Sequence, residues 1–412
     1  MNKDFYAGNR KRLAEEMEMN SLAIFFAGHE PRKTNDEYYP FYTSRNFLYL
    51  TGLEEHHLIL LISKTDKGIE EELYLQEHDM MLERWTGKRY TKDEAQAISG
   101  ITTISYLNLF PMHLQYRIQD HKYETIYLDF DKTAQSDEDT EAYTFAEEFG
   151  KTYPWIKMAN ASHKMARIRT IKQPCEIDAV RKAVEITKAG IVAMMKASHP
   201  GMYEYEYKAE WDHELAKRGV APAFPSIVAA GDNNFCIHYY AYTGQAKDGD
   251  MILNDVGAQW DHLFNDVSRG WPCNGKFTEK QKQLYTCAYN TSQHMFSIIR
   301  PGMQMSDVDR LAREFCFTQL KALGLCDNYE EVGKYIWHGG AHHVGWDVHD
   351  IVDADGPIRP GMIFCVDIGI YCEEWGIGFR LEDNCLVTEG GCENLTASIP
   401  RTIEEIEAVM AH

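Results

Sequence analysis

Four carboxylates occupy matched places in the second half of the chain. Asp255 and Asp266 flank one polar turn, and Asp367 and Glu382 flank a second turn further along. If the first turn is centred between residues 260 and 261, Asp255 faces Asp266 directly. If the second is centred between residues 374 and 375, Asp367 faces Glu382 directly. Opposed carboxylates about 5 Å apart destabilise a β pair unless a positive charge lies between them. The pattern therefore predicts a cation site.

A glycine-rich segment between the two hairpins carries several histidines. His338, His342 and His349 lie within twelve residues, and glycine lets the backbone approach a ligand closely. A neutral imidazole with four carboxylates suits two divalent ions such as Mn²⁺, Fe²⁺, Co²⁺ or Zn²⁺. His343 is expected to be structural, as single histidines usually are. Turn, capping or supporting roles are expected for Asp261, Asp347, Asp350 and Asp383.

The elements that position these side chains form an internal repeat. A helix-period segment ends in Pro-Gly, and a second helical stretch and strands follow; the same order then recurs. Two similar α+β halves that share one core are the simplest explanation. The four helices are expected at residues 176–198, 204–217, 279–299 and 307–323.

The first half of the chain reads as a separate α/β domain without a catalytic cluster. An amphipathic helix opens it, and strands are expected at residues 21–26, 58–63, 72–76 and 125–130. The character of the sequence changes at about residues 160–168. We therefore expect an N-terminal domain at residues 1–163 and a second domain at residues 164–412.

Composition excludes several classes of protein. The 42 Lys and Arg against 63 Asp and Glu give a net charge of −21, which disfavours binding to nucleic acid or anionic membranes. The ten cysteines contain no Cys-x-x-Cys pair, which argues against a zinc ribbon. The N-terminal segment is charged, and no apolar run is long enough to span a bilayer. We expect a cytoplasmic protein with free thiols.

These motifs resemble the pita-bread metallopeptidases, the superfamily of methionine aminopeptidase, prolidase and aminopeptidase P. The resemblance implies an α+β catalytic domain with a pseudo-twofold repeat and two divalent metal ions, with Mn²⁺ favoured over Co²⁺, Zn²⁺ or Fe²⁺. The family's five metal ligands fall on Asp255, Asp266, His342, Asp367 and Glu382. Its three additional active-site histidines fall on His238, His338 and His349.

The N-terminal half is similar to the creatinase-type domain of aminopeptidase P. Residues 45–52 (Arg-Asn-Phe-Leu-Tyr-Leu-Thr-Gly) and 83–87 (Glu-Arg-Trp-Thr-Gly) match its characteristic strings. Methionine aminopeptidases lack this domain, so the resemblance implies an Xaa-Pro aminopeptidase. Prolidase, an Xaa-Pro dipeptidase, remains an alternative. So do a metal-poor creatinase-like protein that binds peptides or proteins and a metal-free amidinohydrolase.

The chain departs from the family pattern at one ligand. Asp367 begins Asp-Ile-Gly-Ile-Tyr where the family has Glu-Pro-Gly-Ile-Tyr, and Asp266 begins Asp-Val-Ser-Arg-Gly where Asp-Ile-Thr-Arg-Thr is usual. One methylene less draws the carboxylate of Asp367 back by roughly 1.3 to 1.5 Å. Because Asp is still an anionic oxygen ligand and the other positions hold, we expect an active enzyme.

The resemblance also implies roles for these side chains. Asp266 and Glu382 would bridge the two metals, and Asp367 would take the proton of the attacking water. His238 or His349 would stabilise the oxyanion. Three further roles are expected, for Arg380 in orienting the carboxylates, for Asp255 in binding the substrate ammonium, and for His338 with His349 in packing the proline ring. The partner is a peptide substrate, and a homo-oligomer, a dimer or tetramer, is expected.

Overall fold

The computed structural model describes residues 1–411, which fall into two compact units, each with its own sheets. The first unit runs from Met1 to Arg169, and the second begins at Thr170. The boundary at 163/164 expected from the sequence lies inside helix α7 (Ser162–Thr170). Within residues 1–411, no helix is both long and apolar enough to cross a bilayer.

A six-stranded mixed sheet forms the centre of the first unit, in the order β4-β3-β2-β1-β5-β6. The sequence predicts β1, β2, β3 and β5 but not the two edge strands β4 and β6. These two are short and largely unburied, so they lack the apolar pattern of a core strand. The strands are β1 (Ser21–Phe26), β2 (Ile59–Thr65), β3 (Gly68–Leu75), β4 (Ile104–Tyr106), β5 (Thr125–Leu128) and β6 (Lys157–Asn160).

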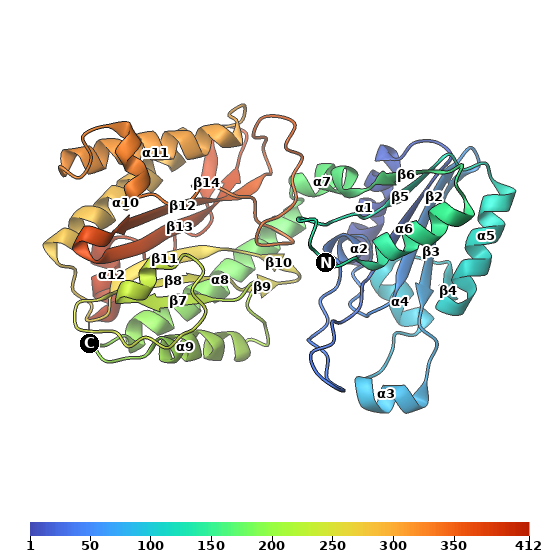
Figure 1. Cartoon of the computed structure of the whole chain (residues 1–412), viewed down its shortest axis with the longest axis horizontal. Coiled ribbons are helices and arrows are strands. Elements are labelled where there is room, and N and C mark those ends of the chain that lie inside the picture. The colour runs from blue at the N-terminus through green and yellow to red at the C-terminus, as the bar shows by residue number, and fades with distance from the viewer. Residues whose placement is uncertain (412) are drawn as a thin grey trace. The chain divides into compact units, whose positions relative to one another are not determined.

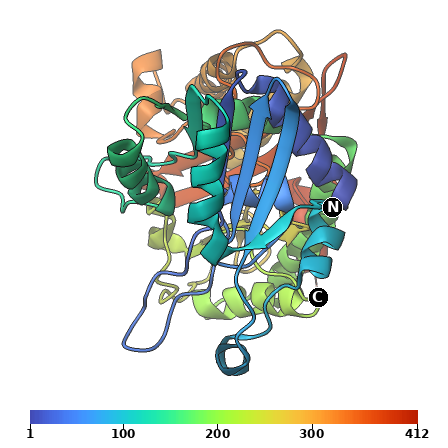
Figure 2. The ribbon, with the colours of Figure 1, turned by 90° about the vertical axis from the view of Figure 1, so that its right-hand side faces the viewer.

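Helices pack on this sheet in two groups (Figures 1 and 2). Leu22 and Ile24 of β1 share a buried core with Leu114 of α5 and Phe149 of α6. Helices α1, α2 and α4 pack against one another, α1 also contacting β2 and α2 contacting β1. The helices are α1 (Lys3–Glu16), α2 (Arg45–Thr51), α3 (Met80–Thr86), α4 (Lys92–Ser99), η1 (Leu107–Leu109), α5 (Phe110–Asp120) and α6 (Glu141–Thr152).

The second unit contains the repeated helix pairs that the sequence predicts, with ends that differ by one or two residues. Each pair is joined by a Pro-Gly turn, and Gly201 and Gly302 adopt φ of +89° and +95°, a region that glycine enters without strain. The helices are α8 (Pro174–Ala197), α9 (Glu204–Ala216), η2 (Gly231–Phe235), α10 (Glu279–Ile298), α11 (Met305–Ala322), η3 (Tyr329–Lys334), η4 (Glu373–Trp375) and α12 (Ile403–Met410).

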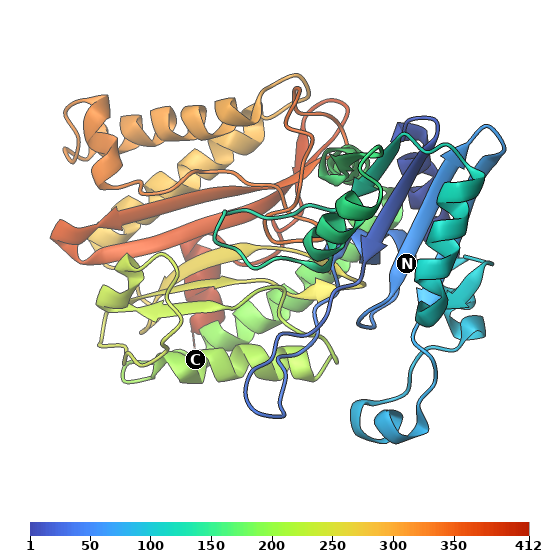
Figure 3. The ribbon, with the colours of Figure 1, turned by 45° about the vertical axis from the view of Figure 1, so that its right-hand side comes forward.

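Two three-stranded sheets lie between these helix pairs. Figure 3 shows α10 and α11 along one side of the long β12–β13 ribbon, and α8 and α9 along β7, β8 and β11. In the ribbon Asp367 lies directly opposite Glu382, as predicted. The strands are β7 (Ile227–Ala230), β8 (Met251–Val256), β9 (Gln259–Trp260), β10 (Leu263–Phe264), β11 (Val267–Pro272), β12 (Ile363–Cys372), β13 (Ile377–Val387) and β14 (Cys392–Asn394).

The register of the other hairpin differs from the sequence prediction. Asp255 on β8 faces Ser268 on β11, so the expectation that it faces Asp266 directly is wrong. The turn is centred between Asp261 and His262, which both adopt positive φ, of 49° and 71°. This centre lies one position later than expected and shifts the pairing by two residues. Because side chains alternate along a strand, Asp266 still projects to the same face as Asp255.

Candidate metal centre

One cavity in the second unit, of about 450 Å³, gathers side chains that are far apart in the sequence. Strands β8, β12 and β13 and the loops that carry the histidines contribute to its wall. Every residue that the sequence analysis assigns to the site lines this cavity, namely His238, Asp255, Asp266, His338, His342, His349, Asp367, Arg380 and Glu382.

The four carboxylates each have one buried oxygen without a hydrogen-bond partner among the described residues. These oxygens are Oδ1 of Asp255, Asp266 and Asp367 and Oε1 of Glu382. Two of the other oxygens are engaged, since Arg380 Nη2 donates to Asp255 Oδ2 at 2.8 Å and Ser268 Oγ donates to Glu382 Oε2 at 2.8 Å. A buried carboxylate oxygen without a partner is costly. Four such oxygens around one cavity therefore fit divalent cations.

His342 is the imidazole next to these carboxylates. Its Nε2 lies 3.3 Å from Glu382 Oε1 and 3.5 Å from Asp266 Oδ2. Burial alone would lower the pKa of His342, but Glu382 outweighs burial and raises it to about 9. Burial and the charge of Glu382 raise the pKa of both Asp266 and Asp367 well above the usual range. The cavity therefore holds an excess of negative charge that a cation would neutralise.

Arg380 organises one wall of the cavity. Besides its bond to Asp255, its Nη1 donates to Tyr371 Oη and to the Ile237 carbonyl, both at 3.2 Å. Burial alone would lower the pKa of this guanidinium, but Asp255 and Tyr371 outweigh burial and raise the pKa above its usual value. The group therefore stays charged. The network fixes Asp255 Oδ2 and leaves Oδ1 without a partner.

His338 contacts the carboxylate at which the chain departs from the family pattern. Its Nδ1 lies 3.2 Å from Asp367 Oδ2, and its Nε2 lies 3.0 Å from Tyr371 Oη. A Cβ at Gly369 would lie 2.4 Å from His338 Nε2, so glycine at this place gives the ring its room. Burial lowers the pKa of His338, which keeps the imidazole neutral.

The remaining two histidines lie beside other aromatic rings. The ring of His349 is centred 4.3 Å from the ring of His342, and burial lowers the pKa of His349. His238 is exposed, and its ring stacks on Tyr240 with centroids 6.4 Å apart. Both line the cavity and can reach a ligand without first breaking a hydrogen bond to a carboxylate.

Sequence reasoning missed side chains that contact the candidate ligands. Cys365 Sγ lies in one group with ligand atoms of Asp266, His342 and Glu382, all within 4.8 Å of one another. Asn384 Nδ2 donates to Cys365 Sγ at 3.4 Å and to the Asp266 carbonyl at 2.7 Å. Residues two apart on a strand share a face, so this period along β12 could have identified Cys365 and Tyr371 from Asp367.

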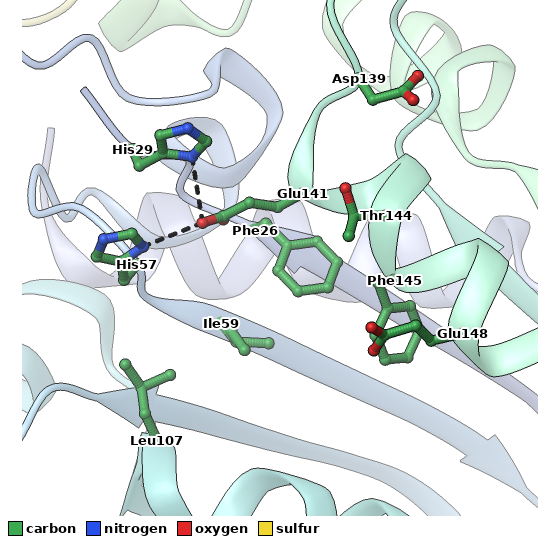
Figure 4. A pocket seen from close by; sticks show the side chains of 10 residues that line it. All are labelled: Phe26, His29, His57, Ile59, Leu107, Asp139, Glu141, Thr144, Phe145 and Glu148. Atoms are coloured by element: carbon green, nitrogen blue, oxygen red, sulfur yellow. Dashed lines mark hydrogen bonds and ion pairs between the residues drawn. The ribbon is translucent and has the colours of Figure 1, made fainter. Parts of the chain in front are cut away.

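The first unit contains a separate cavity of about 650 Å³, shown in Figure 4. Glu141 Oε1 lies 3.0 Å from Nδ1 of His57 and 3.4 Å from Nδ1 of His29. Phe26, Ile59, Leu107 and Phe145 supply apolar lining. These side chains come together only in the fold, and none of them belongs to the site predicted from the sequence.

Comparison with known proteins identifies the family. Residues 178–389 match metallopeptidase family M24, and residues 6–127 match the N-terminal domain of aminopeptidase P. The chain belongs to metallopeptidase family M24. It is therefore a metal-dependent peptidase. Its N-terminal domain is of the aminopeptidase P type, as the resemblance implied.

Relatives of this family match the chain over its length. An Xaa-Pro aminopeptidase of Escherichia coli is 31% identical over 433 aligned residues, which cover 97% of this chain and 96% of that protein. A structure described as an aminopeptidase P of Bacillus anthracis has a TM-score of 0.97 at 35% identity, covering 100% of this chain and 98% of that one. Zinc-substituted E. coli aminopeptidase P in complex with product has a TM-score of 0.90 at 29% identity, with the same coverage. The α/β N-terminal domain and pita-bread catalytic domain are thus confirmed.

Proposed function

We propose that this chain is an Xaa-Pro aminopeptidase, which releases the N-terminal residue from peptides whose second residue is proline. The names of its M24 relatives support this activity. The observation that carries the proposal is the set of four buried carboxylate oxygens without a hydrogen-bond partner in one cavity, with His342 Nε2 3.3 Å from the oxygen of Glu382. Such a donor set fits two divalent ions.

Five side chains that line the cavity would hold the two ions, namely Asp255, Asp266, His342, Asp367 and Glu382. When bound, the ions lower the pKa of a water molecule so that a nucleophile is available near neutral pH. Mn²⁺ is the proposed metal, because carboxylate oxygens and one imidazole form a hard ligand set.

The remaining steps belong to side chains of the chain itself. Asp367 would accept a proton from the attacking water. His238 or His349 would donate a hydrogen bond to the carbonyl oxygen of the scissile bond as negative charge develops on it. His338 and His349 would pack against the proline ring. Arg380 would keep Asp255 in place to accept a hydrogen bond from the substrate ammonium.

We also propose that the protein works as a homo-oligomer, a dimer or tetramer, in the cytoplasm. Helix α3 supports an interface, since Met80 and Trp85 are 77% and 85% exposed and none of its residues is buried. Exposed apolar side chains in a cluster are typical of interaction surfaces. All ten cysteines are free thiols, which suits a reducing compartment.

The test compares Xaa-Pro-Xaa and Xaa-Ala-Xaa tripeptides after the protein is loaded with Mn²⁺, Co²⁺ or Zn²⁺. We expect release of the first residue from the proline peptide, little from the alanine peptide, and loss of both metal and activity in Asp266→Asn. Asp261→Asn is the matched control, because it removes the same charge from an exposed turn whose positive φ asparagine adopts readily. Equal metal content in Asp266→Asn and the wild type would contradict the ligand assignment.

A further inference from the structure

Helix α11 binds the backbone of the segment that carries His338. Arg313 Nη2 donates to the His338 carbonyl at 2.7 Å, and Nη1 donates to the Ile336 carbonyl at 3.3 Å. One turn earlier on the helix, Asp309 Oδ1 accepts the Gly340 N–H at 2.8 Å. Arg313 Nε lies 3.4 Å from the same Asp309 oxygen, so the two side chains form one unit.

The other side of this segment is bound to strand β12. The Asp367 N–H donates to the Gly340 carbonyl at 2.9 Å, and the Cys365 N–H donates to the His342 carbonyl at 2.7 Å. Gly340 therefore receives a bond from β12 at its carbonyl and gives one to α11 at its amide. A Cβ at Gly340 would lie 3.2 Å from the Asp367 carbonyl oxygen, which leaves little slack between loop and strand.

Lys321 of α11 also donates to a loop backbone, at 3.0 Å to the Asp327 carbonyl, but among the described side chains of this helix it is Arg313 and Asp309 that reach the segment carrying His338. Arg310, one turn away, pairs with Asp307 and Glu314 of its own helix, at 3.0 and 2.9 Å. The Arg313 and Asp309 side chains are 24% and 40% exposed, so neither is needed to fill the core. Their bonds instead reach a loop without regular secondary structure, whose own backbone leaves these polar groups free to bond elsewhere.

We propose that Asp309 and Arg313 are positioning residues, which hold the loop with His338 and His342 against β12 and so fix both imidazoles in the cavity. The inference rests on the proposed function, in which His338 contacts the proline ring and His342 binds metal. Neither Asp309 nor Arg313 lines the cavity, so neither touches the substrate. Their effect passes through the backbone of residues 336–340.

The effect of removing them follows from the bonds that are lost. Without Arg313, the carbonyls of Ile336 and His338 lose charge-assisted hydrogen bonds, and without Asp309 the Gly340 amide loses its acceptor. The loop then samples other conformations, in which His338 meets the proline ring less often. KM for an Xaa-Pro peptide should therefore rise more than kcat falls.

Hydrogen exchange of the full chain with Mn²⁺ tests the proposal alongside the kinetics. We expect residues 336–342 to exchange about tenfold faster in Arg313→Ala and Asp309→Ala, as loss of one charge-assisted hydrogen bond implies. Arg313→Lys should lie between, because one ammonium cannot reach both carbonyls in the same geometry. Arg310→Ala is the control, since it removes an arginine and its ion pairs from the same helix, and it should exchange like the wild type.

Different results would overturn the positioning role of Asp309 and Arg313 and the proposed aminopeptidase activity. If residues 336–342 exchange equally in Arg313→Ala, Asp309→Ala and Arg310→Ala, the positioning role is wrong, whatever the enzyme cleaves. If the wild type cleaves no Xaa-Pro peptide, the proposed function is wrong, while the exchange data still decide whether α11 holds the loop. Should the alanine variants not fold, Arg313→Lys gives the comparison on its own, and wild-type exchange of residues 336–342 in that variant would overturn the proposal.

Discussion

Asp367 presents a shorter side chain than the glutamate of the family pattern, yet it keeps its place in the β12–β13 ribbon opposite Glu382. Its Oδ2 lies 3.2 Å from His338 Nδ1, and its Oδ1 has no hydrogen-bond partner among the described residues. The site therefore retains a free anionic oxygen at this position, drawn back toward the strand. Geometry at the second metal should be the weak point of the centre.

Lengthening this side chain tests that weakness. Asp367→Glu should tighten the second metal by about tenfold, because the added methylene restores the reach of the carboxylate. Titration of the metal-free protein with Mn²⁺ in a calorimeter measures the change. Unaltered metal affinity with a large loss of activity would instead show that the surrounding side chains are packed around aspartate.

Helices and strands could be predicted from the sequence where a local pattern defines them, but not where tertiary packing does. The helices α8 to α11 and strands β1, β2, β3 and β5 could be predicted because apolar periodicity and Pro-Gly turns are local signals. The β8–β11 register could not be predicted. Its two turn residues, Asp261 and His262, both have positive φ, yet they are not a residue pair typical of such turns. Nor could the bonds from Arg313 to the His338 loop, which depend on how α11 packs.

Gly257 explains how the interrupted β8–β11 hairpin places Asp266. A Cβ at this residue would lie 1.9 Å from the Asn265 carbonyl oxygen, the residue directly before Asp266. The backbone of the two strands therefore approaches here more closely than any side chain allows.

Gly257→Ala should displace Asp266 and lower both metal affinity and the unfolding free energy of the second unit, the latter by about 1–3 kcal/mol, as overpacking does. Metal titration and urea unfolding measure the two effects. Gly390→Ala is the control, because nothing lies within 4 Å of its added Cβ. Equal metal affinity in the two variants would show that the hairpin tolerates the methyl group without moving Asp266.

At the scale of the whole molecule, each unit has polar groups buried by contacts that no local pattern contains. In the first unit Asn46 Nδ2 donates to both carboxylate oxygens of Asp129 at 2.9 Å, and Arg169 Nη1 donates to Asn46 Oδ1 at 2.7 Å. The three residues come from distant parts of the sequence, so composition and periodicity give no sign of them. Burial raises the pKa of Asp129 to about 6.

This raised pKa makes the stability of the first unit depend on pH. From pH 4 to pH 6 the folded state holds a proton on Asp129 that the unfolded chain has released, so the stability from this group falls as pH rises. The loss is about 3 kcal/mol at most, for a shift of about two pH units. Relative to the wild type, Asp129→Asn should therefore gain stability between pH 4 and pH 7.

Hydrogen exchange at β5 and urea unfolding, each at pH 4 and at pH 7, measure that gain in stability. Asp120→Asn is the control, since it removes a carboxylate from an exposed position at the end of α5. A stability difference between Asp129→Asn and the wild type that stays constant from pH 4 to pH 7 would show that Asp129 is ionised throughout.

In the proposed reaction, the metal centre in the second unit cleaves the first peptide bond of a chain with proline in second place. The most direct measurement is mass spectrometry of the products from one Xaa-Pro-Xaa-Xaa peptide, with its amino end free or acetylated, and from the dipeptide Xaa-Pro. We predict one free amino acid and Pro-Xaa-Xaa from the free peptide and no products after acetylation, because in the proposed mechanism Asp255 accepts a hydrogen bond from the substrate ammonium. Cleavage of the dipeptide alone would identify a dipeptidase, and no cleavage with Mn²⁺, Co²⁺ or Zn²⁺ would show that the chain is not an Xaa-Pro aminopeptidase.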